Sequence, residues 1–289
     1  MNFSRPKKVS SSSLKISVPY FIFHQMADYV HGFDPEEQLR LQAQGEILAP
    51  MVYREVDFSN CKHLLEVGSG VGAQTRILLE RFPQLQITCV DSSQVQLAQA
   101  RINLASFGDR VRFVEQDGCS LSLSERFDAA FVCWTLEHVS SPIQLLVRLK
   151  EHLQPGARVY VTEVFNSSLY TSPEFPHFRH YFDLMSSFQR KIGGNPDVGI
   201  ALGNLLTEAG FSTCSTRFDG FYLDRRSGEK RKIFTAYWKE LLKSAAPALL
   251  ESGDCSLQAL KLMEEDLEKI GNDQNAIFFY QFVQAKATL

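Results

Sequence analysis

The sequence predicts an α/β fold built on an open, doubly wound and mostly parallel β-sheet with helices on both faces. Over residues 61–164, short apolar segments alternate with segments of helical periodicity, and glycine or proline separates them. A glycine-rich turn follows the first apolar segment. Short apolar strands that alternate with helices are typical of parallel sheets that are buried on both faces. We therefore expect this stretch to form one open α/β unit.

Length and composition fit one large domain with additions. The chain has 289 residues, of which 44% are apolar and 22% are charged, so it can bury a sizeable core. Its 30 basic and 33 acidic residues give a net charge of −3. That balance argues against bulk electrostatic capture of nucleic acid, and we expect no nucleic-acid partner.

Cysteine spacing and hydropathy indicate the compartment. The six cysteines show neither C-x-x-C spacing nor the intervals of a zinc site, so we expect reduced thiols and a cytoplasmic protein. The sequence contains no run of 18 apolar residues, and we expect no membrane span.

The first 60 residues are expected to form a tail and a helical cap. Residues 1–17 are rich in lysine, arginine and serine, which indicates a disordered tail, with an organelle-targeting peptide as the alternative. Residues 18–60 form the cap. Within it we predict a helix over residues 36–53, because the Asp-Pro pair that precedes this segment is a typical helix start.

Within the α/β unit, apolar runs predict strands and amphipathic runs predict helices. The expected strands are residues 63–67, 86–90, 111–115, 127–133 and 158–162. The expected helices are residues 73–82, 93–106 and 142–153.

The regular alternation stops after residue 164. Seven aromatic residues lie within 165–188, which indicates an aromatic lid over a substrate, and we place a lid insertion at residues 165–200. A helix at 203–209, a strand at 211–218 and a segment at 232–242 that begins as a strand complete the α/β domain, which we extend over residues 61–243. The remaining residues, 244–289, are predicted to be a C-terminal helical segment.

The Gly-Ser-Gly turn at residues 68–70 joins the first expected strand to a helix. Glycine lets the backbone approach a ligand closely at the carboxyl end of a parallel strand. Alone, this turn suits either a dinucleotide or S-adenosylmethionine. Carboxylates after successive strands favour the second. Glu66 would repel a pyrophosphate but could bind a cationic amino-acid end, directly or through water. Asp91 suits ribose hydroxyls, and Asp117 suits an adenine amino group.

The chain resembles the class I S-adenosylmethionine-dependent methyltransferases in five motifs that follow one another: LLEVGSGVGAQT, ITCVDSS, VEQDG, FDAAFVCWTLEHV and LKEHLQPGARVYVTE. The likeness is strongest to the small-molecule branch, which includes quinone-biosynthesis and natural-product methyltransferases. It implies a seven-stranded sheet whose last strand is antiparallel, with S-adenosylmethionine as the cofactor. The residues then expected to bind this cofactor are Tyr29, Glu66, Gly68, Ser69, Gly70, Asp91, Ser92, Gln96, Asp117, Gly118, Cys133 and Trp134.

Methyl transfer from a sulfonium is an in-line displacement, for which a protein chiefly supplies alignment, exclusion of water and sometimes a base. The candidate bases are His138 after the fourth strand, His180 in the aromatic segment and His24 in the cap. Packing alone is the alternative role for each. The sequence lacks the acidic triad of magnesium-dependent catechol methyltransferases, so we expect no metal.

These observations predict a methyltransferase that acts on a small, partly hydrophobic organic acceptor. Two alternatives stay open. One is an NAD(P)-dependent oxidoreductase that uses the overlapping Gly68-x-Gly70-x-x-Ala73 pattern, and the other is a non-catalytic, methyltransferase-like partner subunit. A homodimer is one option for the assembly, because nothing in the sequence fixes the oligomeric state.

Overall fold

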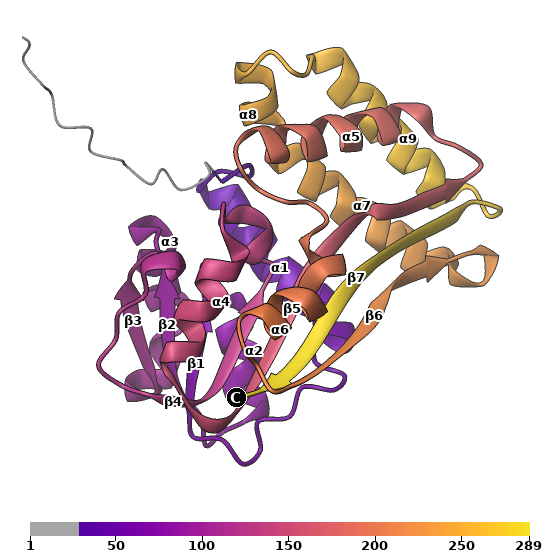
Figure 1. The fold of residues 1–289 in the computed structure, drawn as a ribbon. Coiled ribbons are helices and arrows are strands. Elements are labelled where there is room, and N and C mark those ends of the chain that lie inside the picture. Colours follow the sequence, from indigo (N-terminus) through magenta and orange to yellow (C-terminus); the bar gives the residue numbers. More distant parts are fainter. Residues whose placement is uncertain (1–28) are drawn as a thin grey trace, which may run out of the picture.

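The computed structural model describes residues 29–289, which form one seven-stranded sheet with helices on both faces (Figure 1). The strands are β1 (His63–Val67), β2 (Gln86–Asp91), β3 (Val111–Glu115), β4 (Phe127–Cys133), β5 (Leu153–Ser172), β6 (Thr213–Leu223) and β7 (Ile277–Thr288). Their order is β3-β2-β1-β4-β5-β7-β6. The first five strands pair in parallel, whereas β7 lies antiparallel between β5 and β6. This confirms the predicted fold class and the antiparallel last strand that the resemblance implies.

Nine α-helices occur within residues 29–289. They are α1 (Pro35–Val52), α2 (Ala73–Arg81), α3 (Gln94–Asn103), α4 (Pro142–Glu151), α5 (Pro176–Lys191), α6 (Leu202–Glu208), α7 (Gly228–Ser244), α8 (Ala246–Glu251) and α9 (Leu257–Asn272). Helix α1 starts as predicted, because the Asp34 carboxylate accepts hydrogen bonds from the backbone N–H groups of Glu36 and Glu37. None of the helices in this part of the chain is both long and apolar enough to cross a bilayer.

Alternation along the strands places an apolar core on each face of the sheet. Leu64 and Tyr160 belong to a core that includes side chains of α1, α2, α5, α7 and α9. Their chain neighbours Leu65 and Val161 belong to a second core with α4 and α6. Because successive side chains of a strand point to opposite faces, both faces of the central strands are buried.

The predicted strand at the start of residues 232–242 is wrong, because this segment lies inside α7. The buried residues of that helix include Arg231, Thr235, Trp238 and Leu242. Their spacing of three or four residues is the period of a helix. The apolar run KIFTAYW is so short that its pattern fits a strand and a buried helix segment equally well.

The predicted C-terminal helical segment, residues 244–289, is correct for α8 and α9 but wrong for its end. Residues 277–288 form β7, which supplies the antiparallel strand inside the sheet. Its buried aromatic residues Phe278, Tyr280 and Phe282 alternate with more exposed ones, which is the period of a strand. The sheet therefore extends beyond the predicted α/β boundary at residue 243.

The predicted lid insertion at residues 165–200 divides into two parts. Residues 165–172 continue β5, and Tyr170 on this extension is exposed to solvent. Helix α5 follows, and its Phe182 and Met185 line the cavity described below. The predicted tail at residues 1–17 and the first part of the predicted cap, with His24, lie outside the described residues.

A carboxylate from α9 caps the start of α5. The residue that precedes α5, Phe175, offers no side-chain acceptor. The Asp266 carboxylate, which is buried, instead accepts hydrogen bonds from the backbone N–H groups of His177 at 3.0 Å and Phe178 at 3.2 Å. The first N–H groups of a helix need such acceptors, so this contact fixes α5 against α9.

We expect Asp266→Ala to lower the free energy of unfolding by about 2 kcal/mol, because a buried and a partly buried N–H group lose their acceptor. Asp266→Asn keeps one acceptor oxygen and should lose less. Urea unfolding followed by circular dichroism measures both changes. The control is Asp183→Ala, which removes an exposed α5 carboxylate and should stay within about 0.5 kcal/mol of the wild type. Equal stability of the Asp266→Ala and Asp183→Ala variants would contradict this role.

Candidate active site

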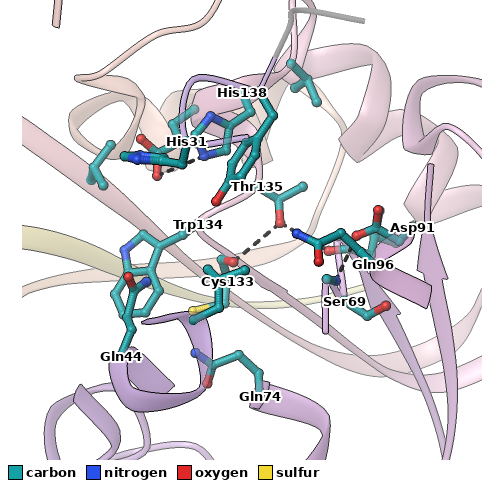
Figure 2. Close-up of a pocket in the computed structure, with 18 of the residues that line it drawn as sticks. His31, Gln44, Ser69, Gln74, Asp91, Gln96, Cys133, Trp134, Thr135 and His138 are labelled. Carbon is teal, nitrogen blue, oxygen red and sulfur yellow. Dashed lines mark hydrogen bonds and ion pairs between the residues drawn. The ribbon is translucent and has the colours of Figure 1, made fainter. Parts of the chain in front are cut away.

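A cavity of about 310 Å³ opens at the carboxyl ends of β1, β2 and β4 and continues beneath α1, α5 and α7. Figure 2 shows Ser69, Asp91 and Gln96 on one side of it, and Trp134, Gln44, His31 and His138 on the other. The strand ends and the helical cover thus line one continuous space. This is the place where open parallel sheets bind their ligands.

The predicted glycine turn borders this cavity. Gly68 and Gly70 have φ values of 75° and 52°, which favour glycine. A Cβ on Gly68 would overlap the Thr135 side chain, so this position also needs glycine for packing. A Cβ on Gly70 would meet nothing within 4 Å. The backbone at Gly70 therefore faces open space, where a ligand can approach it closely.

Asp91 ends β2 and lies beside the glycine turn. Its Oδ2 accepts a hydrogen bond from the Gly70 N–H at 2.8 Å, and its Oδ1 accepts one from the Ser93 N–H at 2.9 Å. Burial raises the pKa of Asp91, while these backbone N–H groups oppose the shift. Each oxygen keeps a lone pair for a further donor, and Asp91, Ser92 and Gln96 all line the cavity.

Asp117 follows β3 and completes this side of the cavity with Gly118. The Asp117 Oδ1 accepts a hydrogen bond from the Cys119 N–H at 2.9 Å. A Cβ on Gly118 would press into Leu145 and Val67, so glycine is required where this turn packs against α4. The arrangement fixes one carboxylate oxygen of Asp117 and leaves the other without a hydrogen-bond partner within residues 29–289.

Glu66 lies beneath the turn and is not among the residues that line the cavity. Its side chain is buried, and its Oε2 accepts a hydrogen bond from the Thr75 hydroxyl at 2.7 Å. Burial raises the pKa of Glu66 to about 8. Any contact with a ligand in the cavity would have to pass through water or require a shift of this side chain.

The end of β4 brings Cys133 and Trp134 to the cavity. Trp134 has a φ of 54°, which is unusual for a residue with a side chain, and its N–H donates to the Thr162 carbonyl at 2.8 Å. Its ring packs edge-on against Phe282 of β7, with the ring centroids 6.0 Å apart. The strained backbone thus turns the indole towards the cavity, which Trp134 and Gln44 both line (Figure 2).

Sequence analysis missed Glu163, which fixes the loop after β4. This fully buried carboxylate on β5 accepts hydrogen bonds from the N–H groups of Thr135 at 2.9 Å, Leu136 at 2.7 Å and Glu137 at 3.3 Å. Burial, followed by the charge of Glu137, raises the pKa of Glu163 to about 8. An acidic residue at the end of an otherwise apolar strand, VYVTE, is the signal that could have revealed it.

His138 lines the cavity directly after this loop, in a short 3-10 turn (Leu136–His138). Its ring packs edge-on against Tyr29, with centroids 4.9 Å apart, and lies 6.3 Å from the ring of His31. Burial lowers the pKa of His138 and, more strongly, that of His31. Both imidazoles are therefore neutral at pH 7 and able to accept a proton.

The predicted Tyr29 lies in the cavity wall and takes part in an ionic network that sequence analysis missed. Its hydroxyl donates to Glu37 Oε1 at 3.0 Å, and the guanidinium of Arg40 donates to both Glu37 oxygens at 2.6 Å. Arg40 also donates to Gln44 Oε1 at 2.5 Å. Three-residue spacing on α1 places the acid and the base on one helix face, a signal present in the sequence.

The other two candidate bases are not part of the described cavity. His180 is exposed on α5 and does not line it, so the structure does not bring this histidine to the site. Helical periodicity explains the difference, because Phe178, Phe182 and Met185 occupy the inward face of α5. His24 lies outside the described residues.

Comparison with known proteins identifies the central part of the chain. Residues 65–159 match the family model of a methyltransferase domain. A trans-aconitate 2-methyltransferase of Acidovorax sp. (strain JS42) is 32% identical over 127 residues, which cover 44% of this chain and 48% of that protein. An O-methyltransferase of Penicillium expansum is 25% identical over 192 residues, which cover 64% and 66% of the two chains. The chain thus spans about half to two thirds of the length of these curated relatives.

The solved structures extend this likeness to the fold. Phosphoethanolamine N-methyltransferase 2 of Haemonchus contortus, in complex with phosphomonomethylethanolamine and S-adenosylhomocysteine, superposes with a TM-score of 0.52 at 20% identity. The match covers 84% of this chain and 52% of that chain. The fold is therefore that of the class I methyltransferases.

The raised pKa of Glu163 predicts how stability depends on pH. Because the folded value, about 8, lies above the ordinary value of 4.5, the folded state binds this proton more tightly than the unfolded state. Stability from this group is complete below about pH 4.5 and is lost as the pH rises towards 8. Relative to Glu163→Gln, the wild type should lose on the order of 3 kcal/mol between pH 5 and pH 8.

Urea unfolding of both proteins at several pH values measures this difference. The exposed Glu151→Gln variant is the control, and its stability should follow the wild type at every pH. If the curves of the wild type and Glu163→Gln run parallel, Glu163 does not hold its proton in the folded state.

Proposed function

We propose that this chain, whose residues 65–159 form a methyltransferase domain on the class I fold, transfers a methyl group from S-adenosylmethionine to a small, partly hydrophobic organic acceptor. The observation that carries the proposal is the continuity of one cavity. Its strand-end side presents a glycine turn and two carboxylates, and its other side is aromatic. One side suits a polar nucleoside and the other an apolar acceptor.

The strand-end residues fit the proposed cofactor in their chemistry. Asp91 has two oxygens that are already oriented by N–H donors, which suits a pair of ribose hydroxyls. The Ser69 hydroxyl is buried and has no hydrogen-bond partner within residues 29–289, so it is free to bond a ligand. Asp117 and Gly118 would meet the base, and Cys133, Trp134 and Tyr29 the amino-acid end. S-adenosylmethionine, when bound, supplies an activated methyl group on a sulfonium.

The protein's own contribution is alignment, exclusion of water and proton acceptance. Aromatic side chains cover the cavity, and Glu163 orients the loop that carries His138. We propose His138 as the proton acceptor, because it is neutral, lies in the cavity wall and is fixed by its neighbours. Glu66 is proposed to act through water.

The alternatives differ in their support. The comparisons give no support to an NAD(P)-dependent oxidoreductase. A turnover assay distinguishes an enzyme from a non-catalytic partner subunit. We also propose a cytoplasmic location, which the six free cysteines, four of them buried, support. A homodimer stays a prediction that sedimentation tests.

We expect Asp91→Ala to weaken binding of S-adenosylhomocysteine by about 1–3 kcal/mol, because hydrogen bonds to a ligand's hydroxyl groups are lost. Isothermal titration calorimetry measures the affinity. The exposed Asp109→Ala variant is the control and should bind like the wild type. Binding of NADH in place of S-adenosylhomocysteine by the wild type would overturn the proposed function.

For the proposed base, we expect His138→Gln to lower kcat about 10²–10⁴-fold while the affinity for S-adenosylhomocysteine stays unchanged. Because its pKa lies below 6.5, the wild-type kcat should be level at neutral pH and fall only in more acidic buffer. The variant should lack this acid limb. A pH profile of kcat measures both. If His138→Gln still loses activity in acidic buffer as the wild type does, a group other than His138 accepts the proton.

A further inference from the structure

The cavity has a second half, which we call the acceptor lobe. It is the part lined by Glu137, His138, Gln189, Tyr237, Trp238 and Tyr280. These residues come from the loop after β4, from α5, from α7 and from β7. None of them was expected to bind the cofactor.

We propose that the acceptor lobe binds a protonated amine, with Glu137 as its counter-ion and aromatic rings around it. The methyl acceptor is then an amine with an apolar body. Once it is bound, its ammonium would give one proton to His138, and the freed nitrogen lone pair would form the bond to the methyl carbon as the bond from that carbon to the sulfonium sulfur breaks. This inference rests on the proposed function, because it names the substrate class of the same cavity.

The first argument is that the lobe offers no cation to an anionic acceptor. Within residues 29–289, Arg40 is the single guanidinium or ammonium group that lines the cavity. Both oxygens of Glu37 engage it at 2.6 Å, and Gln44 takes a further N–H. Arg40 and Glu37 are both buried, so the pair is closed and electrically neutral. A carboxylate or phosphate acceptor would enter this lobe without a cationic partner, and the donor it would meet is the indole N–H of Trp238, which is buried and has no hydrogen-bond partner within residues 29–289.

The second argument is that Glu137 is a buried carboxylate with incomplete compensation. Its Oε2 accepts a hydrogen bond from the Gln189 amide at 2.9 Å, and its Oε1 lies 3.6 Å from His138 Nε2. The imidazoles of His138 and His31 are neutral, because burial lowers the pKa of both. A buried charge is costly unless a cation pairs with it, and a ligand ammonium would supply that cation.

Glu163 does not change this balance. It lies directly below Glu137, and its raised pKa of about 8 means that it is protonated at pH 7. Glu163 also does not line the cavity, so Glu137 is the carboxylate of this region that a ligand meets. Burial raises the pKa of Tyr237 and Tyr280, and the nearby Glu137 adds to both shifts.

The third argument is the aromatic wall. Trp238 packs edge-on against Tyr280 at 4.9 Å between centroids, and Phe182 lies 5.5 Å from Trp238. The Tyr237 hydroxyl donates to Gln44 and the Tyr280 hydroxyl donates to Asn166, so each tyrosine oxygen can offer a further partner only its acceptor lone pairs. Aromatic faces and oxygen acceptors attract an ammonium group.

The test uses matched ligands that differ only in the charge of the tail. The probes are phenethylamine, 2-phenylethanol and 3-phenylpropionate, and tryptamine, tryptophol and indole-3-propionate. Each is titrated calorimetrically into the protein saturated with S-adenosylhomocysteine. We expect each amine to bind at least about tenfold more tightly than its alcohol, and each carboxylate to bind most weakly.

A variant assigns the selectivity to one residue. Glu137→Gln should weaken amine binding about tenfold or more and leave alcohol binding within about twofold, because only the charge is removed. Its affinity for S-adenosylhomocysteine should also stay within about twofold. Glu174→Gln removes an exposed carboxylate near the start of α5 and should retain the amine preference.

Several results would overturn the proposal. They are alcohol or carboxylate binding as tight as that of the matched amine, no measurable amine binding, or unchanged amine binding by Glu137→Gln. If Glu137→Gln weakens S-adenosylhomocysteine as much as it weakens amines, Glu137 belongs to the cofactor end and the proposal is wrong. The comparison of amines, alcohols and carboxylates on the wild type tests the proposal even if the Glu137→Gln variant does not fold. If the wild type does not bind S-adenosylhomocysteine at all, the proposed function itself is refuted.

Discussion

The hydrogen bonds between Glu163 and the loop after β4 are the contact on which both halves of the cavity depend. Parallel pairing places Cys133 of β4 beside Thr162 of β5, so the next residue on β5 lies directly under the loop. There its carboxyl group accepts three successive N–H groups that no strand could satisfy. Without this acceptor, a buried loop would carry unpaired N–H groups. The loop's conformation, and with it the placement of Trp134 and His138, follows from one side chain.

The same loop explains why the cofactor end and the acceptor lobe are geometrically coupled. Thr135 fills the space above Gly68, so the glycine turn and the end of β4 fit only together. Asp91 fixes the other side of that turn through the Gly70 N–H. A change at any of these contacts would move the backbone that faces the cofactor and the side chains that face the acceptor. Close packing of this kind transmits small shifts across a site.

Much of the fold could be predicted because its signals are local. The strands up to β4 and the start of β5 are short apolar runs between glycine or proline, and Asp34 marks the start of α1. The errors arise where the pattern is ambiguous or the pairing is distant. A seven-residue apolar run in α7 resembles a strand, whereas β7 follows a long amphipathic helix and pairs with residues that lie 55 or more positions earlier in the chain. The length of the apolar run does not distinguish a strand from part of α7, and no local sequence pattern predicts that β7 returns to the sheet.

The site divides in the same way. The turn at 68–70, Asp91 and Asp117 lie in consecutive strand-end motifs, so sequence brought them together correctly. Glu66 belongs to the same motif, but its side chain points below the turn because strand alternation directs it towards Thr75. The acceptor lobe has no motif, since Glu137, Gln189 and Tyr237 come from segments that only the fold brings together.

Burial gives the two ends of the cavity opposite electrostatic characters. At the strand ends, backbone N–H groups compensate the carboxylate of Asp91, so a polar ligand meets acceptors that are already oriented. At the far end, burial lowers the pKa of both histidines, and Arg40 is paired with Glu37. Glu137 is then the carboxylate that an acceptor meets. Selectivity for an amine over an anion in this lobe depends less on the groups that attract the ammonium than on the lack of an unpaired cation in the described cavity wall, which could bind an anion. A charged acceptor of the wrong sign is then rejected by the cost of its own desolvation.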